Sequence, residues 1–242
     1  LSSKNLLNPA NGQPVVSPIQ DMVLGINQMT LEKRSGKGRG MLVSSISEAE
    51  MAQEFGVIDF QSLIKIRFTY QDKEWTTRFP KVDWETQKYY MVETTLGRLI
   101  FNSCLPAHFE YINDSLDEKG IQRTISKCYL EFGPAETANT LDRVKAIGFR
   151  FSTIFGSTIG LDDVKIPSKK SQLIERTDKE VEKIENQFRL GYITDDERYN
   201  KIVDVWSHTS DKISSEMMKE LKIHKDGFNS LYVMANSGAR GS

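Results

Sequence analysis

The chain has 242 residues, of which 38% are hydrophobic and 27% charged, and its formal net charge is −1. This composition is typical of a globular protein of one or two domains, and the balanced charge excludes a global basic field for nucleic acid. No apolar run reaches the roughly 18 residues of a membrane-spanning helix. Cys104 and Cys128 are too few and too far apart for a disulfide framework or a zinc site. We therefore expect two partly buried thiols in a reducing cytoplasm.

The N-terminal region begins with a proline-rich loop over residues 5–18. Ser17 and Pro18 then predict a helix start, with Ser17 as the N-cap and Gln20 at the capping-box position. Residues 33–40, KRSGKGRG, form a basic glycine-rich loop whose amides could hold phosphate. A solvated loop is the alternative, because the flanking strand and helix of a phosphate-binding loop are missing.

The next region predicts a small β element. Ser47 opens a capping box for a short helix that ends by Gly56, and residues 63–70 alternate as a half-buried strand does. Residues 75–79 are expected to pair with that strand across a turn. Glu93 and Arg98 are expected to form a surface ion pair.

Helical patterns follow from Ser115, and Gly133 with Pro134 predicts a break between two helices. Asp162 and Asp163 come after a loop of small residues and could hold magnesium. The alternative is that Asp163 caps or charges the start of the next helix. The three histidines are scattered and predict neither a catalytic triad nor a metal site.

Residues 167–221 predict two long antiparallel helices. Each carries a narrow apolar seam with charged residues on its other faces, which is typical of an antiparallel coiled coil. Pro167 suits the first turn, Gly191 the left-handed position after the first helix, and residues 194–197 a capping box for the second. An ordinary hairpin inside a helical bundle is the alternative. The seam residues are Ile174, Val181, Ile184 and Phe188, then Tyr199, Ile202, Trp206, Ile213 and Met217.

Eight short segments, spread in order over nearly the whole chain, carry a resemblance to one family. They are NPANGQP (8–14), SPIQDMVLG (17–25), TLGR (95–98), GF (148–149), IGLDD (159–163), ERYNK (197–201), FNS (228–230) and SGARGS (237–242). Together they resemble the largest catalytic subunit, beta-prime, of bacterial RNA polymerase.

Leu1 is not a start residue, and the chain stops in a glycine-rich turn. Together with the resemblance, these two ends imply an internal fragment of that subunit. The implied fold is α+β and predominantly helical, with a small β element and a long antiparallel helical hairpin. Residues 1–46 would lie on the active-centre side and residues 47–166 in the pore or funnel of the secondary channel. Residues 167–222 would form the rim-helix coiled coil, and residues 223–242 would start the next active-centre segment.

The family is a nucleotidyltransferase that performs DNA-directed RNA synthesis. Its metal-binding aspartates lie outside the matching segments, so the resemblance implies no catalytic residue and no metal ligand here. The isolated fragment is expected to be inactive. Mg²⁺ would act in the full enzyme, and Zn²⁺ would be bound elsewhere in the subunit. The implied location is the bacterial cytoplasm, in association with the nucleoid.

The resemblance also implies two groups of site residues. Arg240 matches an arginine that contacts the triphosphate of the incoming nucleotide, a task that suits an always-charged guanidinium. Gln20 matches a residue lining the active centre, with the capping role as its alternative, and Ser242 lies in the same loop as Arg240. The residues expected to dock protein factors on the hairpin are Arg189, Asp195, Asn200 and Lys201.

The implied partners are the beta, alpha and omega subunits, DNA, RNA and nucleoside triphosphates. Gre-type cleavage factors or DksA-like regulators would dock on the hairpin. A guanosine tetraphosphate site is not expected: Asp142, Asn200 and Lys201 match it, but Asn139 and Ala146 replace its usual apolar and aromatic residues. The alternative function is a free-standing interaction module that uses the hairpin to bind a partner helix.

Overall fold

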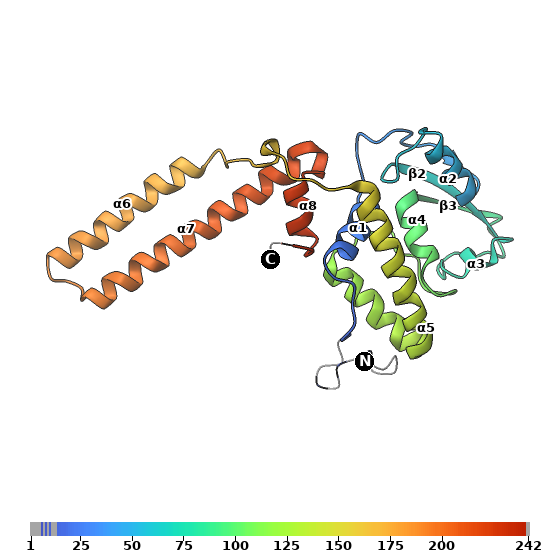
Figure 1. Cartoon of the computed structure of the whole chain (residues 1–242), viewed down its shortest axis with the longest axis horizontal. Helices are drawn as coiled ribbons and strands as arrows, with labels where there is room; N and C mark the ends of the chain where they lie inside the picture. The colour runs from blue at the N-terminus through green and yellow to red at the C-terminus, as the bar shows by residue number, and fades with distance from the viewer. Residues whose placement is uncertain (1–5, 7, 9, 11–13, 241–242) are drawn as a thin grey trace. The chain divides into compact units, whose positions relative to one another are not determined.

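The computed structural model describes residues 6, 8, 10 and 14–240, and it is predominantly helical with a small sheet, as predicted (Figure 1). Its contacts define two compact units, Leu1–Thr158 with Val233–Ser242, and Ile159–Tyr232. The helices and strands are α1 (Asp21–Thr30), β1 (Leu42–Val43), α2 (Ile46–Glu54), β2 (Leu63–Thr69), α3 (Lys73–Thr76), β3 (Tyr89–Thr95), α4 (Leu96–Ser103), α5 (Glu118–Phe155), η1 (Leu161–Asp163), α6 (Lys170–Arg189), α7 (Asp195–Ile223), η2 (His224–Gly227) and α8 (Ser230–Asn236).

The sheet of the first unit has three strands within the described residues, in the order β1-β2-β3. The short β1 runs parallel to β2, and β3 runs antiparallel to β2 with Leu63 opposite Thr95. The alternation predicted for β2 is confirmed, since Ile64, Ile66 and Phe68 are buried between exposed neighbours. These side chains join α2 and α4 in one hydrophobic core.

The predicted pairing of β2 with residues 75–79 is wrong. The Asp72 carboxylate accepts hydrogen bonds from the Thr69 amide (2.7 Å) and hydroxyl (2.9 Å), and the chain then turns into α3. The Phe68 ring packs instead on the rings of Trp75 and Phe79, with centroids 5.3 and 5.5 Å apart. Trp75 and Phe79, which suggested a strand, therefore pack their rings on Phe68 and form no strand pairing.

Helix α1 is buried against α5 and α4 by backbone contact. A Cβ added at Gly25 would lie 2.0 Å from the Gly148 carbonyl oxygen, and one at Gly97 would lie 1.9 Å from the Met29 carbonyl oxygen. Only glycine allows such close crossings, because any side chain would overlap the opposing backbone. The two crossings fix the position of α1 and of the residues at its N-terminus.

Arg98 lies inside this unit and not on its surface, so the predicted Glu93–Arg98 ion pair is wrong. Arg98 is 9% exposed and donates from Nε to the Thr30 carbonyl (3.0 Å) and from Nη1 to Asn113 (3.3 Å). Glu93 pairs with Lys65 on β2 at 3.3 Å. Because α4 begins at residue 96, Arg98 falls on its inward face, and burial lowers the pKa of the guanidinium.

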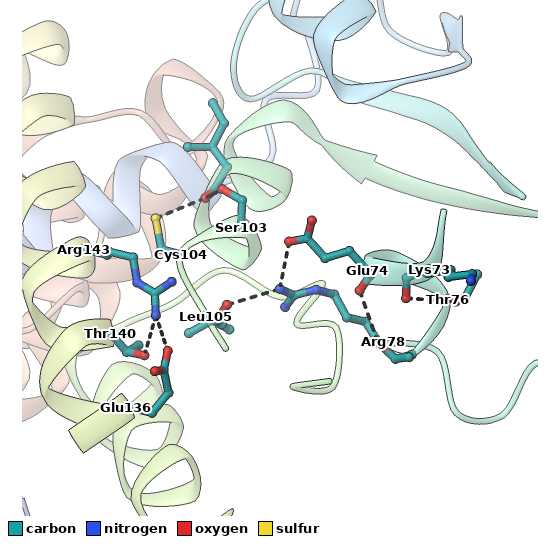
Figure 2. Close-up of polar contacts among 12 residues, drawn as sticks. Lys73, Glu74, Thr76, Arg78, Ser103, Cys104, Leu105, Glu136, Thr140 and Arg143 are labelled. Carbon is teal, nitrogen blue, oxygen red and sulfur yellow. Dashed lines mark hydrogen bonds and ion pairs between the residues drawn. The ribbon is translucent and has the colours of Figure 1, made fainter. Parts of the chain in front are cut away.

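A second arginine, Arg78, is buried at the contact between α3 and the chain after α4 (Figure 2). It lies over the Trp75 ring (5.0 Å), donates to the Leu105 carbonyl (3.2 Å) and approaches Glu74 at 4.0 Å. Burial lowers the pKa of Arg78 and raises that of the nearby Cys104 thiol. Cys104 and Cys128 are both free thiols and are buried more deeply than the partial burial that was expected.

The predicted break at Gly133 and Pro134 is confirmed. Gly133 adopts φ = 80° inside α5, so two helical segments meet there at a kink. The first segment begins after Asp117, whose carboxylate accepts from the Gly120 amide at 2.7 Å. The helix thus starts at Glu118, three residues after Ser115, where the helical pattern was predicted to begin.

Two capping predictions in the N-terminal region need correction. Helix α1 begins at Asp21, so Ser17 does not cap it. Helix α2 is capped by Ser45, whose hydroxyl accepts from the Glu48 amide at 3.1 Å, and not by Ser47. In both cases the cap is the residue just before the first helical residue. Tertiary packing decides where the helical backbone begins, so the sequence signal missed the cap by two or three residues.

Four backbone amides of the loop of residues 33–40 donate hydrogen bonds within the fold, those of Lys33, Gly36, Lys37 and Gly40, so they are not free to bind phosphate. The Lys37 amide donates to Asp59 (3.2 Å) and the Gly40 amide to the Leu63 carbonyl (2.7 Å). Lys33 also pairs with Asp59 at 3.5 Å. The loop is packed on the chain before β2, and its hydrogen-bonding groups serve the fold.

Candidate functional site

The first candidate site is a corner formed by the start of α1 and the turn after α8. The Arg240 guanidinium donates from Nη2 to the Asp21 carboxylate at 2.8 Å, and both side chains are about half exposed. Asp21 is the first residue of α1, and Gln20 immediately precedes it. The corner therefore brings together two of the predicted nucleotide-binding residues, while Ser242 lies outside the described residues.

The turn that carries Arg240 is fixed to the N-terminus of α5. The Glu118 amide donates to the Ser237 carbonyl at 2.9 Å, and Ser237 and Ala239 are buried. Gly238 has φ = 77°, and a Cβ there would lie 2.8 Å from the Glu118 carboxylate. These contacts hold the backbone of the turn, while the long Arg240 side chain reaches solvent.

Gln20 occupies an uncommon backbone conformation, φ = 49° and ψ = −117°, at the N-cap position of α1. Its carbonyl accepts from the Leu24 amide at 2.9 Å, but its side chain makes no capping hydrogen bond and is exposed. The capping alternative for the Gln20 side chain is therefore wrong. A non-glycine residue with positive φ costs energy, and such residues concentrate at functional sites.

The second candidate site is the helical hairpin of α6 and α7, which lie side by side and antiparallel (Figure 1). The turn prediction is confirmed: Gly191 has φ = 77°, and Thr194 and Glu197 form a reciprocal capping box. Pro167 lies before the first helix and not in its first turn, since α6 begins at Lys170. The short connection makes the hairpin stiff at its tip.

The predicted seam between the helices is confirmed in its middle, whereas its aromatic positions are exposed. Ile184 is buried, and Val181, Ile202 and Ile213 are half-buried. Tyr199 is 65% exposed, and Phe188 and Trp206 are 37% and 38% exposed. The remaining seam positions near the centre are filled by two buried threonines, Thr177 and Thr209, which the apolar pattern missed.

The hydroxyls of Thr177 and Thr209 hydrogen-bond to each other at 2.7 Å across the seam. Each hydroxyl also lies 2.9 Å from the carbonyl four residues earlier, so the pair satisfies itself without water. A single buried polar pair in an apolar seam favours one alignment of the helices, because any shift breaks the hydrogen bond between the two hydroxyls.

We expect Thr177→Val or Thr209→Val alone to cost about 1 kcal/mol of hairpin stability, because the remaining hydroxyl loses its partner across the seam and keeps only the carbonyl of its own helix. The double variant should regain most of that loss, since both partners become apolar groups of the same shape. Hydrogen exchange of the α6 and α7 amides would measure the coupling in a double-mutant cycle. Additive effects would show that the two hydroxyls do not interact.

The tip of the hairpin is held by Arg198. Its guanidinium contacts Asp195 at 2.7 Å and Glu185 at 2.9 Å, and it lies over the Phe188 ring at 5.0 Å. The hydrogen bonds with Asp195 and then Glu185 raise the pKa of Arg198. Of the predicted docking residues, Asp195 is thus engaged within the tip. All four predicted docking residues, including Arg189, Asn200 and Lys201, are exposed.

The base of the hairpin is tied by charged groups. Lys169 and Lys219 contact Glu216, both at 2.8 Å, and lower its pKa to about 2. Asp163 is buried, accepts from the Gly160 amide (2.9 Å) and pairs with Lys225 at 2.5 Å. These contacts lower the pKa of Asp163, with the Lys225 hydrogen bond the larger cause.

Asp163 therefore closes the η1 turn and binds the end of the hairpin, instead of capping α6 or offering a metal ligand. Within residues 14–240, no three His, Cys, Asp or Glu side chains lie close enough together to hold a metal ion. None of the helices that the structure describes has the length and apolar character needed to span a bilayer.

Comparison with known proteins matches residues 5–164 to the family model "RNA polymerase Rpb1, domain 3" and residues 193–242 to "RNA polymerase Rpb1, domain 4". The chain belongs to the family of the largest RNA polymerase subunit. Between the two matched regions lie residues 165–192, which include all of α6.

Similar proteins are bacterial subunits named "DNA-directed RNA polymerase subunit beta'". The one from Treponema pallidum is 42% identical over 243 residues, and those from Heliobacterium modesticaldum and Leptospira biflexa are 40% identical. Each alignment covers the whole chain but only 16–20% of the relative. Membership of this polymerase family favours the polymerase hypothesis over a free-standing interaction module.

Proposed function

We propose that this chain acts as part of a bacterial DNA-directed RNA polymerase, a nucleotidyltransferase of the cytoplasm. In this proposal the first unit shapes the secondary channel through which nucleotides enter. The α6–α7 hairpin is the arm on which transcript-cleavage factors dock. The beta, alpha and omega subunits, DNA and RNA are its partners in the assembled enzyme.

The observation that carries the docking role is the construction of the hairpin. The helices are aligned by the Thr177–Thr209 pair, the tip is held by Arg198, and the base is tied through Glu216. Large apolar side chains nevertheless remain exposed near the tip, among them Leu190, Tyr192 and Tyr199. A stiff element with an exposed apolar end is suited to binding another protein, since little order is lost on association.

The channel role rests on the corner of Arg240, Asp21 and Gln20. The turn that carries Arg240 is well packed, but the Arg240 guanidinium points to solvent. There the guanidinium can release the Asp21 carboxylate and bind a phosphate oxygen in its place. The described residues offer no ligand set for Mg²⁺, so the metal that drives nucleotide transfer would be held by other parts of the subunit. Arg240 and Gln20 would bind and orient the nucleotide without taking part in proton or metal chemistry.

Removing the hairpin tests the docking role in a reconstituted polymerase. We expect replacement of residues 168–220 by a short glycine-serine linker to abolish stimulation by a Gre-type cleavage factor while basal elongation persists. Factor binding and elongation on one template would be measured side by side. Equal loss of elongation and stimulation would make the hairpin a structural element of the enzyme, and full stimulation without it would end the docking proposal.

A further inference from the structure

Leu116, two residues before helix α5, is held by two side chains of α1. The Leu116 amide donates to the Thr30 hydroxyl at 3.0 Å, and the Leu116 carbonyl accepts from Asn27 Nδ2 at 2.8 Å. Thr30 and Asn27 are 0% and 3% exposed. Water does not reach these bonds, so the loss of either one would leave a buried polar group of the backbone unpaired. The two bonds therefore fix the chain at Leu116 against α1.

Residues 117–118 connect this anchor to the turn that carries Arg240. Asp117 caps α5 with a hydrogen bond of 2.7 Å, which defines the backbone conformation just before the helix. The Glu118 amide then donates to the Ser237 carbonyl at 2.9 Å. A short and fully bonded stretch of chain thus joins α1 to the Arg240 turn.

Helix α1 is a rigid support for this stretch. It meets α5 at Gly25 and α4 at Met29 by backbone contact, so it has no room to shift. Its first residue, Asp21, pairs with Arg240 at 2.8 Å, and its other end holds the chain that leads to the Arg240 turn. Both halves of the corner are therefore placed by the same helix.

We propose that Thr30 and Asn27 are positioning residues for Arg240. Both are buried, so neither touches the nucleotide; they hold the chain at Leu116 and, through it, the turn from which the guanidinium reaches the triphosphate. The Asp21 ion pair is a weaker constraint, because it joins two half-exposed side chains. A guanidinium binds phosphate oxygens well only in a narrow range of positions, so small shifts of the turn weaken binding. This inference rests on the proposed nucleotide contact of Arg240 and names the residues that set its geometry.

The test is single-nucleotide addition by reconstituted polymerase over a range of nucleotide concentrations, which separates kcat from KM. Thr30→Val keeps the shape of the side chain but removes the hydroxyl, so kcat/KM should fall about threefold to tenfold, chiefly through KM. Thr30→Ser keeps the hydroxyl and should restore parental kinetics. Asn27→Ala removes only the bond to the Leu116 carbonyl and should act in the same direction as Thr30→Val.

Ser62→Ala is the matched control. Ser62 is a fully buried residue of the same unit, and its hydroxyl donates to the Lys37 carbonyl at 2.5 Å, away from the stretch that leads to Arg240. Its loss should leave the kinetics unchanged. A fall in kcat/KM equal to that of Thr30→Val would assign both effects to the stability of the unit and overturn the positioning role.

A double variant separates positioning from general structural damage. In the Arg240→Ala background, Thr30→Val should cause no further fall in kcat/KM, because the side chain that Thr30 positions is gone. Additive losses would overturn the inference, and so would a loss with Thr30→Ser as large as that with Thr30→Val. Should the Thr30→Val polymerase fail to assemble, Asn27→Ala carries the same cycle with Arg240→Ala, since it leaves Thr30 in place.

The positioning role and the nucleotide contact can fail separately. Parental kinetics for Arg240→Ala would end the nucleotide contact, and the positioning role with it. Impaired kinetics for Arg240→Ala with parental kinetics for Thr30→Val and Asn27→Ala would leave the nucleotide contact standing and overturn only the positioning role.

Discussion

Gly25→Ala should prevent α1 from packing and should cost about 3 kcal/mol or more of the free energy of unfolding. The new methyl group would lie 2.0 Å from the Gly148 carbonyl oxygen and 2.7 Å from the Ser152 amide nitrogen. Both are backbone atoms of α5, so no side chain can rotate away. In an open helix the same change would stabilise by up to about 1 kcal/mol, because alanine is the better helix former. At Gly25 the steric cost exceeds that gain, so the substitution lowers the free energy of unfolding instead of raising it.

Denaturant unfolding of the 242-residue chain would measure this effect, and Gly148→Ala should behave similarly because its Cβ would lie 2.9 Å from Met22. Gly160→Ala is the matched control. Gly160 has φ = −104°, and the nearest atom to an added Cβ is 3.7 Å away, so the control should change stability little. A Gly25→Ala chain as stable as the parent would show that α1 and α5 do not cross this closely.

Arg240→Ala should lower kcat/KM for nucleotide incorporation about tenfold to hundredfold in the reconstituted polymerase. Hydrogen bonds between a guanidinium and a phosphate are charge-assisted, and alanine leaves that charge on the nucleotide without a partner. The turn itself should survive, because the contacts of Ser237 and Gly238 with Glu118 do not involve the Arg240 side chain. Single-nucleotide addition kinetics on a fixed template would measure the change.

Asp21→Asn is the informative companion to Arg240→Ala. It removes the ion pair at 2.8 Å but keeps the guanidinium, so incorporation should stay near the parental rate or rise. The ion pair joins two exposed side chains and contributes little to stability, so neither variant should impair assembly. Parental kinetics for Arg240→Ala would remove this residue from the nucleotide site. An equal loss for both variants would instead assign the ion pair a structural role.

Much of the helical architecture could be predicted from the sequence, because helix ends and breaks depend on a few neighbouring residues. Gly133 and Pro134 break α5, Gly191 ends the first arm helix, and Thr194 with Glu197 caps the second. These outcomes depend on residues three or four positions apart, and backbone sterics and capping act over that range. The antiparallel hairpin followed from the same signals and a short connection.

Side-chain environments were predicted less well. Arg98 was expected on the surface beside Glu93 but is buried against the Thr30 carbonyl, a residue 68 positions away in sequence. Tyr199 and Trp206 were expected in the seam but are exposed, while Thr177 and Thr209 are buried in it. Apolar residues that recur with the helical period indicate that a helix has a buried face. Two adjacent rows of side chains on one helix show nearly the same period, so the period does not say which row is buried. Which row is covered depends on the partner helix.

The sequence by itself determined the family, the order of the helices and the hairpin, since each of these rests on residue types or on spacings within a few residues. Only the tertiary structure decided that Arg240 meets Asp21, that Gly25 crosses Gly148, and that Thr177 pairs with Thr209 in the seam of the hairpin. The contacts at Asp21 and Gly148 join residues more than a hundred positions apart. Closing such distances is governed by the packing of whole helices, and no local pattern in the chain carries that information.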